Sequence, residues 1–87
     1  MGYQIKFRAV ANDHFAALDG VIKRRVAAAI DKLTSEPRPP RATLLIGMPG
    51  VRRIRIGDYR VLYTVDDETS EIWVEDVRHR GKAYRRR

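Results

Sequence analysis

The sequence contains no cysteine among its 87 residues. Neither a disulfide framework nor a thiolate metal site is therefore available, which fits a reducing compartment. Long apolar runs are also missing: the longest, Val26–Ile30, is far shorter than the roughly 20 residues that span a bilayer. The N-terminal residues alternate charged with apolar side chains, unlike a signal peptide. We expect a cytoplasmic protein with no membrane partner.

Acidic residues are the scarcer charge, 11 against 18 lysines and arginines, which gives a net charge of +7. The two signs are segregated along the chain. Residues 61–77 contain six acidic and no basic residues, whereas residues 78–87 contain six basic and no acidic residues. This segregation indicates a surface for a polyanion or an acidic protein partner. The alternative is a solvated surface that only keeps the protein soluble.

The length predicts one domain, residues 1–87, with a modest core, since 44% of the residues are hydrophobic. Residues 3–7 alternate apolar with polar side chains, the period of a half-buried strand. A short helix is predicted over residues 12–18, with Asn12 or Asp13 as its cap.

A longer helix follows, beginning at Asp19-Gly20 and ending before the prolines of residues 37–40. Its apolar residues recur at helical spacing: Ile22, Val26, Ile30 and Leu33. The rest of the domain is predicted to be strands separated by turns, over residues 43–46, 51–56, 59–65 and 71–77. The order β-α-α-β-β-β-β predicts an α+β domain in which two N-terminal helices pack on one face of a mostly antiparallel sheet. A basic C-terminal tail follows the last strand.

Arginines occupy two of these strands. Side chains alternate faces along a strand, so Arg53 and Arg55 share one face of residues 51–56. In a hairpin with residues 59–65, Arg60 joins them on the face away from the helices. Three guanidinium groups on rigid backbone form a phosphate-sized site. The alternative is that these arginines pair with the acidic residues 66–76, at about 0.2–1 kcal/mol per pair.

The tail contributes two further candidates. Tyr84 can stack on a base, and His79 can transfer a proton or contact a phosphate. The alternative for His79 is a solvated surface group. The other histidine, His14, receives no role.

Four motifs together resemble the RelE/ParE toxin superfamily, specifically the RelE branch of mRNA interferases. They are Leu45 with Gly47, the split pair Arg53-Ile54-Arg55, the run Gly57-Asp58-Tyr59-Arg60-Val61 followed by Tyr63, and His79-Arg80 followed by Tyr84. The resemblance covers essentially the whole chain, and the predicted element order is that of the RelE-like fold.

The resemblance implies a toxin that enters the A site of a translating 70S ribosome and cuts the mRNA there. The RNA 2′-hydroxyl attacks its adjacent phosphate, without metal or cofactor. The partners implied are the ribosome with its mRNA and a cognate antitoxin with an acidic or amphipathic segment; DNA is reached only through the antitoxin. The catalytic residues carried over are Arg53, Arg55, Arg60, Arg80 and Tyr84.

Two residues are candidates for the group that accepts the proton of the 2′-hydroxyl. Guanidinium groups stabilise the charge of the transition state, but arginine, with a pKa of about 12.5–13.8, is not a practical base. One version of the family has lysines in the split pair, where this chain has Arg53 and Arg55. His79 is the first candidate, since histidine has an unperturbed pKa of about 6.5 and other branches of the superfamily use a histidine near this position. Tyr84 is the second.

Other basic residues nearby are expected to contact the RNA and the ribosome: Arg52, Lys82, Arg85, Arg86 and Arg87. Two alternative functions remain open. A ParE-type toxin has the same fold but poisons DNA gyrase, and a catalytically inactive homologue retains only antitoxin binding.

Overall fold

A computed structural model of the chain describes residues 2–80. The elements are β1 (Gln4–Phe7), α1 (Ala9–Ala16), α2 (Gly20–Lys32), β2 (Thr43–Leu44), β3 (Arg52–Ile56), β4 (Tyr59–Asp66) and β5 (Glu71–His79). This order confirms the predicted β-α-α-β-β-β-β arrangement. None of the helices in residues 2–80 is long and apolar enough to cross a membrane.

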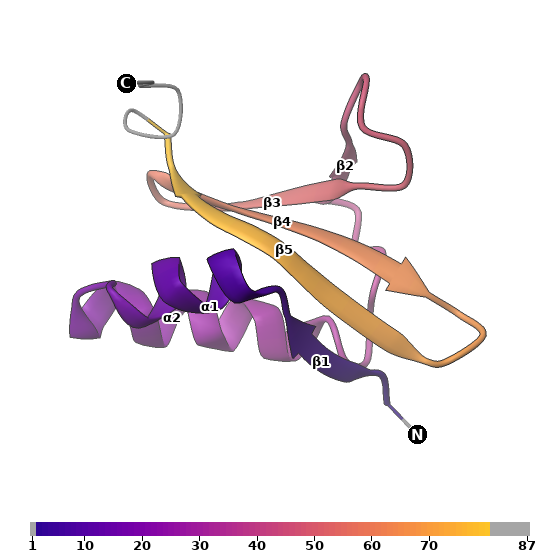
Figure 1. The fold of residues 1–87 in the computed structure, drawn as a ribbon, viewed down its shortest axis with the longest axis horizontal. Helices are drawn as coiled ribbons and strands as arrows, with labels where there is room; N and C mark the ends of the chain where they lie inside the picture. The colour runs from indigo at the N-terminus through magenta and orange to yellow at the C-terminus, as the bar shows by residue number, and fades with distance from the viewer. Residues whose placement is uncertain (1, 81–87) are drawn as a thin grey trace.

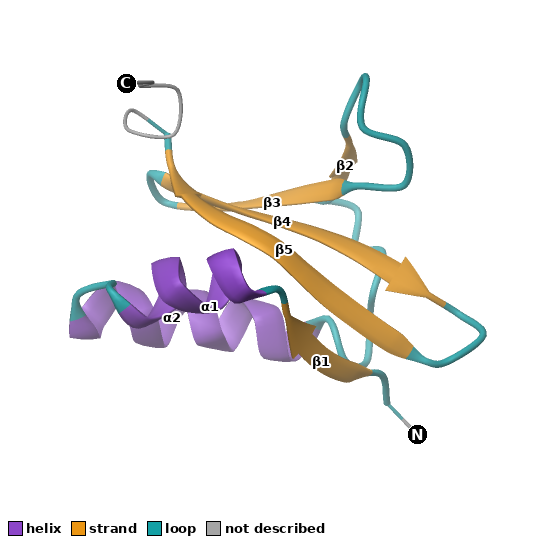
Figure 2. Cartoon of the chain, in the orientation of Figure 1, coloured by secondary structure: helices purple, strands orange, loops and turns teal. Residues whose placement is uncertain are grey.

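The sheet has five strands in the order β1-β5-β4-β3-β2. Only the β1–β5 pair is parallel; the other three pairs are antiparallel. Both helices lie on one side of this sheet (Figures 1 and 2). We call that side the helix-side face and the opposite side the open face, which no helix in the described part of the chain covers.

The long helix was predicted correctly, and the short one was not. Val26, Ile30 and Leu33 of the predicted stripe are at most 4% exposed. Helix α1, however, begins at Ala9 with Arg8 as its N-cap, so Asn12 and Asp13 lie inside the helix. Ala11 is completely buried in the core. Packing of this first turn therefore overrides the capping preference of the two polar residues.

The core lies between the helices and the central strands. Tyr59, Val61, Tyr63 and Val65 of β4 face this core, as the alternation predicted. Strand β5 continues to His79, two residues beyond its predicted end. Tyr59 pairs with His79, and Arg60 pairs with Arg78. Arg78 and His79 therefore belong to the sheet and not to the tail; the change of charge at residue 78 does not mark the end of the strand.

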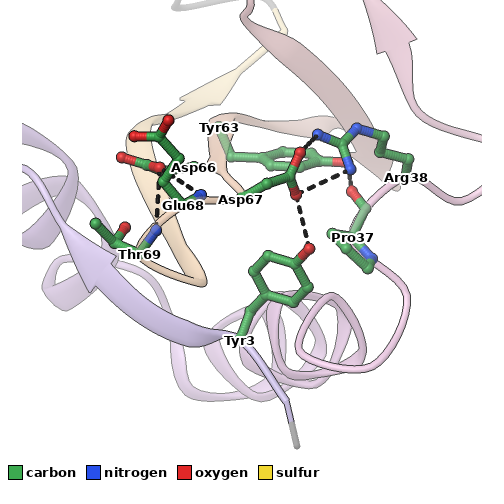
Figure 3. Close-up of polar contacts among 8 residues, drawn as sticks. All are labelled: Tyr3, Pro37, Arg38, Tyr63, Asp66, Asp67, Glu68 and Thr69. Carbon is green, nitrogen blue, oxygen red and sulfur yellow. Dashed lines mark hydrogen bonds and ion pairs between the residues drawn. The ribbon is translucent and has the colours of Figure 1, made fainter.

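A cluster of polar contacts fixes the end of the sheet where β4 turns into β5 (Figure 3). The Tyr3 hydroxyl donates to Asp67 Oδ1 at 2.7 Å, and Arg38 Nη2 donates to Asp67 Oδ2 at 2.8 Å. The buried Tyr63 donates its hydroxyl to the carbonyl oxygen of Pro37 at 2.7 Å. These bonds, which we call the Asp67 cluster, connect β1, the proline-rich segment after α2 and the β4–β5 turn.

Candidate active site

Three arginines lie directly opposite one another on the open face. Arg55 of β3 is the register partner of Arg60 in β4, and Arg60 is the partner of Arg78 in β5. Paired residues of an antiparallel ladder project to the same side, and neighbouring strands are about 4.8 Å apart. Since Ile54 and Ile56 are buried towards the helices, the three guanidinium groups lie on the other side. We call these residues the arginine row.

Arg53 lies beside this row. Its register partner is Leu62, which in turn pairs with Asp76. Leu62 is only 3% exposed although no helix in residues 2–80 covers this face, so the long side chains around it must shield it. Arg53 Nε is also buried and has no hydrogen-bond acceptor in the described part of the chain.

The arginine row is unfavourable for the sheet by itself, because like charges directly opposite each other destabilise a strand pair. No carboxylate among residues 2–80 forms an ion pair with Arg52, Arg53 or Arg55. The acidic residues 66–76 instead pair elsewhere: Asp67 with Arg38, Glu75 with Arg8, Glu71 with Lys6 and Asp76 with Arg78. The alternative in which they neutralise the strand arginines is therefore wrong for Arg53 and Arg55.

Asp76 is an acidic residue that joins the row. Its Oδ2 accepts a hydrogen bond from Arg78 Nε at 2.8 Å. Its Oδ1 accepts from His14 Nδ1 at 2.7 Å and from the backbone N–H of Val77 at 2.8 Å. Burial alone would raise the pKa of Asp76, but the hydrogen bonds from Arg78 and His14 outweigh it and lower that pKa below its ordinary value.

The structure separates His79 from the arginine row. His79 is the register partner of Tyr59, and the two rings meet edge to face with centroids 5.0 Å apart. Since Tyr59 packs against the core, His79 lies on the helix-side face, at the end of β5. Arg52 is the partner of the core residue Tyr63 and also lies on that face.

Arg80 lies next to the turn between β3 and β4, at one side of the row. Its backbone N–H donates to the Asp58 carbonyl oxygen at 2.7 Å, and its guanidinium is 3.9 Å from the Asp58 carboxylate. The remaining predicted residues lie outside the described residues: Lys82, Tyr84, Arg85, Arg86 and Arg87.

Three residues at this site were missed by the sequence prediction: Arg78, Asp76 and His14. The alternation of residues 76, 78 and 80 was the available signal for Arg78, because it continues the period of the strand. No local pattern signals His14, since its contact with Asp76 spans 62 residues of sequence.

Comparison with known proteins gives the class of this domain. A family model described as "ParE toxin of type II toxin-antitoxin system, parDE" matches residues 5–84. A comparison with curated proteins gives no match.

Solved structures of toxin–antitoxin complexes share its fold. A chain of the RelBE2 complex from Mycobacterium tuberculosis superposes with a TM-score of 0.79 at 29% identity, covering 92% of this chain and 100% of that chain. The archaeal RelE–RelB complex from Pyrococcus horikoshii OT3 gives a TM-score of 0.79 at 30% identity, covering 95% and 100%. The intact E. coli RelBE complex gives 0.77 at 25% identity, covering 86% and 93%.

Two helices on one face of a five-stranded sheet are thus the architecture of RelE-like toxins. The chain belongs to the ParE toxin family, within the RelE/ParE superfamily of type II toxin–antitoxin systems. It is the toxin of a toxin–antitoxin pair, as the sequence motifs predicted.

Proposed function

We propose that this toxin is a ribosome-dependent endoribonuclease that cuts mRNA in the A site and so inhibits translation. The observation that carries the proposal is the arginine row, Arg55, Arg60 and Arg78, on adjacent strands of the open face. Like charges directly opposite each other do not stabilise a sheet, and a phosphodiester is a ligand whose charge and geometry match several guanidinium groups.

The chemistry that suits this face is attack of an RNA 2′-hydroxyl on its adjacent phosphate. The five-coordinate phosphorus of the transition state gathers negative charge on its oxygens. Guanidinium groups fixed by paired strands stabilise that charge without having to reorganise. Arg53 and Arg80, at either side of the row, are proposed to hold the phosphates that flank the cut.

The reaction also needs a group that accepts the 2′-hydroxyl proton, and arginine does not serve. Of the two candidates from the sequence, His79 packs against Tyr59 on the helix-side face, and Tyr84 lies outside the described residues. The position of His79 therefore does not support it as the base, and the role is open to another residue.

A second candidate function is inhibition of DNA gyrase, because the family model that matches this chain is named after the ParE toxin. Poisoning gyrase requires binding to a protein–DNA complex and no phosphoryl chemistry by the toxin. For that function the arginine row only has to bind DNA or protein. Flexible lysine side chains would bind these partners equally well. The rigid, strand-borne placement favours the endoribonuclease.

Primer-extension mapping of an mRNA on 70S ribosomes stalled with an empty A site tests the proposal. The purified toxin is expected to cut inside the A-site codon and to leave the same mRNA intact without ribosomes. A parallel assay measures DNA breaks made by gyrase in the presence of the toxin. Gyrase-dependent breaks with intact mRNA would establish the second function, and a folded, antitoxin-binding protein inactive in both assays would be a catalytically dead toxin.

Several of the similar solved structures are toxin–antitoxin complexes, and this supports an antitoxin as a partner of the toxin. A groove of about 560 Å³ runs between α2 and β3. Its lining includes Leu33 and Ile54, and it also contains four basic residues and one acidic residue: Arg25, Lys32, Arg41, Arg55 and Glu36. We propose that an acidic, amphipathic segment of the antitoxin binds here, with its apolar side on Leu33 and Ile54 and its carboxylates on the basic residues. Replacing Lys32 and Arg41 by glutamate is expected to weaken antitoxin binding, as measured by calorimetry.

A further inference from the structure

His14 and Arg78 meet on a single carboxylate at the border of the open face. Strand β1 ends at Phe7, opposite Val74, so beyond that point no described strand pairs with the outer edge of β5. Helix α1 packs against this part of β5 (Figure 1). From there His14 Nδ1 reaches Asp76 Oδ1 at 2.7 Å, while Arg78 Nε lies 2.8 Å from Asp76 Oδ2. The imidazole ring is thus held next to one end of the arginine row.

The contact with Asp76 fixes which nitrogen of His14 carries the proton. An ionised carboxylate only accepts hydrogen bonds, so Nδ1 must be the donor. In the neutral ring, Nε2 then keeps its lone pair. The His14 side chain is 51% exposed, whereas that of Asp76 is 13% exposed. A shielded carboxylate therefore orients an imidazole that remains accessible from solvent, the arrangement that activates general bases in enzymes.

We infer that His14, oriented by Asp76, is the general base of the proposed RNA cleavage. This inference rests on the proposed endoribonuclease function. His14 Nε2 takes the proton of the 2′-hydroxyl as the 2′-oxygen forms a bond to phosphorus. The bond from phosphorus to the 5′-oxygen breaks, and the 5′-oxygen takes a proton from water. The products are a 2′,3′-cyclic phosphate and a 5′-hydroxyl, and the imidazolium returns its proton to water.

Asp76 is a positioning residue in this reaction. The same carboxylate holds Arg78 through Nε, which leaves the terminal nitrogens of that guanidinium for the phosphate. One acidic side chain therefore aligns both the base and one of the three charge-stabilising arginines. This accounts for the placement of an acidic residue next to a row whose function requires positive charge.

A purely structural contact between α1 and β5 is the competing explanation, and asparagine at residue 14 separates the two. In His14→Asn the amide nitrogen takes the position of Nδ1 and can still donate to Asp76, but the side chain has no basic nitrogen. A structural role predicts unchanged cleavage for this variant. General base catalysis contributes about 10²–10⁴-fold, so the inference predicts a loss of about 100-fold or more at an unchanged melting temperature. Free imidazole is expected to restore part of the cleavage by His14→Ala.

The experiment compares wild type, His14→Asn, His79→Gln, and the alanine variants of both histidines with and without imidazole, on stalled 70S ribosomes. Wild-type cleavage rates in His14→Asn, or a loss in His79→Gln that imidazole restores in His79→Ala, would overturn the role of His14. A wild-type protein that cuts nothing would overturn the endoribonuclease proposal and this role with it, an outcome visible without any variant. Nitrogen-15 spectra of the imidazole rings check the geometry in the unmodified protein. A proton on Nδ1 of His14 is expected, and a proton on Nε2 alone would contradict the assignment.

Discussion

Arginines near the two ends of β4 have opposite electrostatic surroundings. Next to the β4–β5 turn, Arg38 donates hydrogen bonds from both terminal nitrogens to Asp67, which also accepts from Tyr3 (Figure 3). At the other end, Arg60 lies between Arg55 and Arg78. The first arrangement pairs opposite charges and fixes a loop, whereas the second places like charges opposite each other on adjacent strands. Positive charge gathered on rigid strands in this way indicates a ligand that carries the opposite charge.

The largest expected effect comes from removing the central arginine of the row. Arg60→Ala is expected to lower the rate of ribosome-dependent cleavage by about 100-fold or more, the typical cost of losing one preorganised charge-stabilising donor. Primer extension on stalled ribosomes measures the rate. Circular dichroism is expected to show a fold like that of the wild type.

Arg38→Ala is the matched control, because it removes the same residue type from the Asp67 cluster. This variant is expected to cut at the wild-type rate with a lower melting temperature. Equal losses of activity in the two variants would show that the row has no special role. Full activity in Arg60→Ala would remove the row from the catalytic site.

The second-largest expected effect changes the stability of the fold and leaves the cleavage activity unchanged. Tyr63 is completely buried, and its hydroxyl donates to the Pro37 carbonyl oxygen. Tyr63→Phe leaves that carbonyl without this donor and is expected to cost about 1–3 kcal/mol of unfolding free energy. Urea denaturation measures this cost, and the cleavage rate per folded molecule is expected to stay unchanged. A stability equal to that of the wild type would mean that water replaces the lost bond.

Much of the fold and part of the site follow from local sequence patterns. Alternation along residues 51–65 predicted that Arg53, Arg55 and Arg60 share the open face, since a strand has a period of two. The apolar stripe of α2 was equally clear. Asp76 and His14 were not predictable in this way, because their contact depends on how α1 packs against the free edge of β5. His79 was predicted to join the site from its unperturbed pKa and from the family resemblance, and the pairing of Tyr59 with His79 places its ring on the helix-side face.

The third prediction tests the Asp67 cluster by pH. Hydrogen bonds from Arg38 and Tyr3 hold the pKa of Asp67 below its ordinary value of 3.8. A lowered pKa in the folded state means that the ionised carboxylate stabilises the fold above about pH 4, and that this contribution disappears as the pH falls through the lowered value. Asp67→Asn is therefore expected to melt below the wild type at pH 7, with the difference shrinking as the pH falls below 3.8. A constant difference across this range would mean that the charge of Asp67 contributes nothing.

The smallest effect has the opposite sign and tests whether the row strains the sheet. Arg55→Gln removes one of two facing like charges and is expected to raise the unfolding free energy by about 0.2–1 kcal/mol. Salt screens such repulsion over about 10 Å at 0.1 M, so the gain should shrink as the ionic strength rises. Arg24→Gln on α2 removes the same charge away from the row and controls for the net charge of the protein. A gain specific to Arg55→Gln, together with slower cleavage, would show that the toxin keeps the row at the expense of its own stability, as expected of a binding site and not of a structural pair.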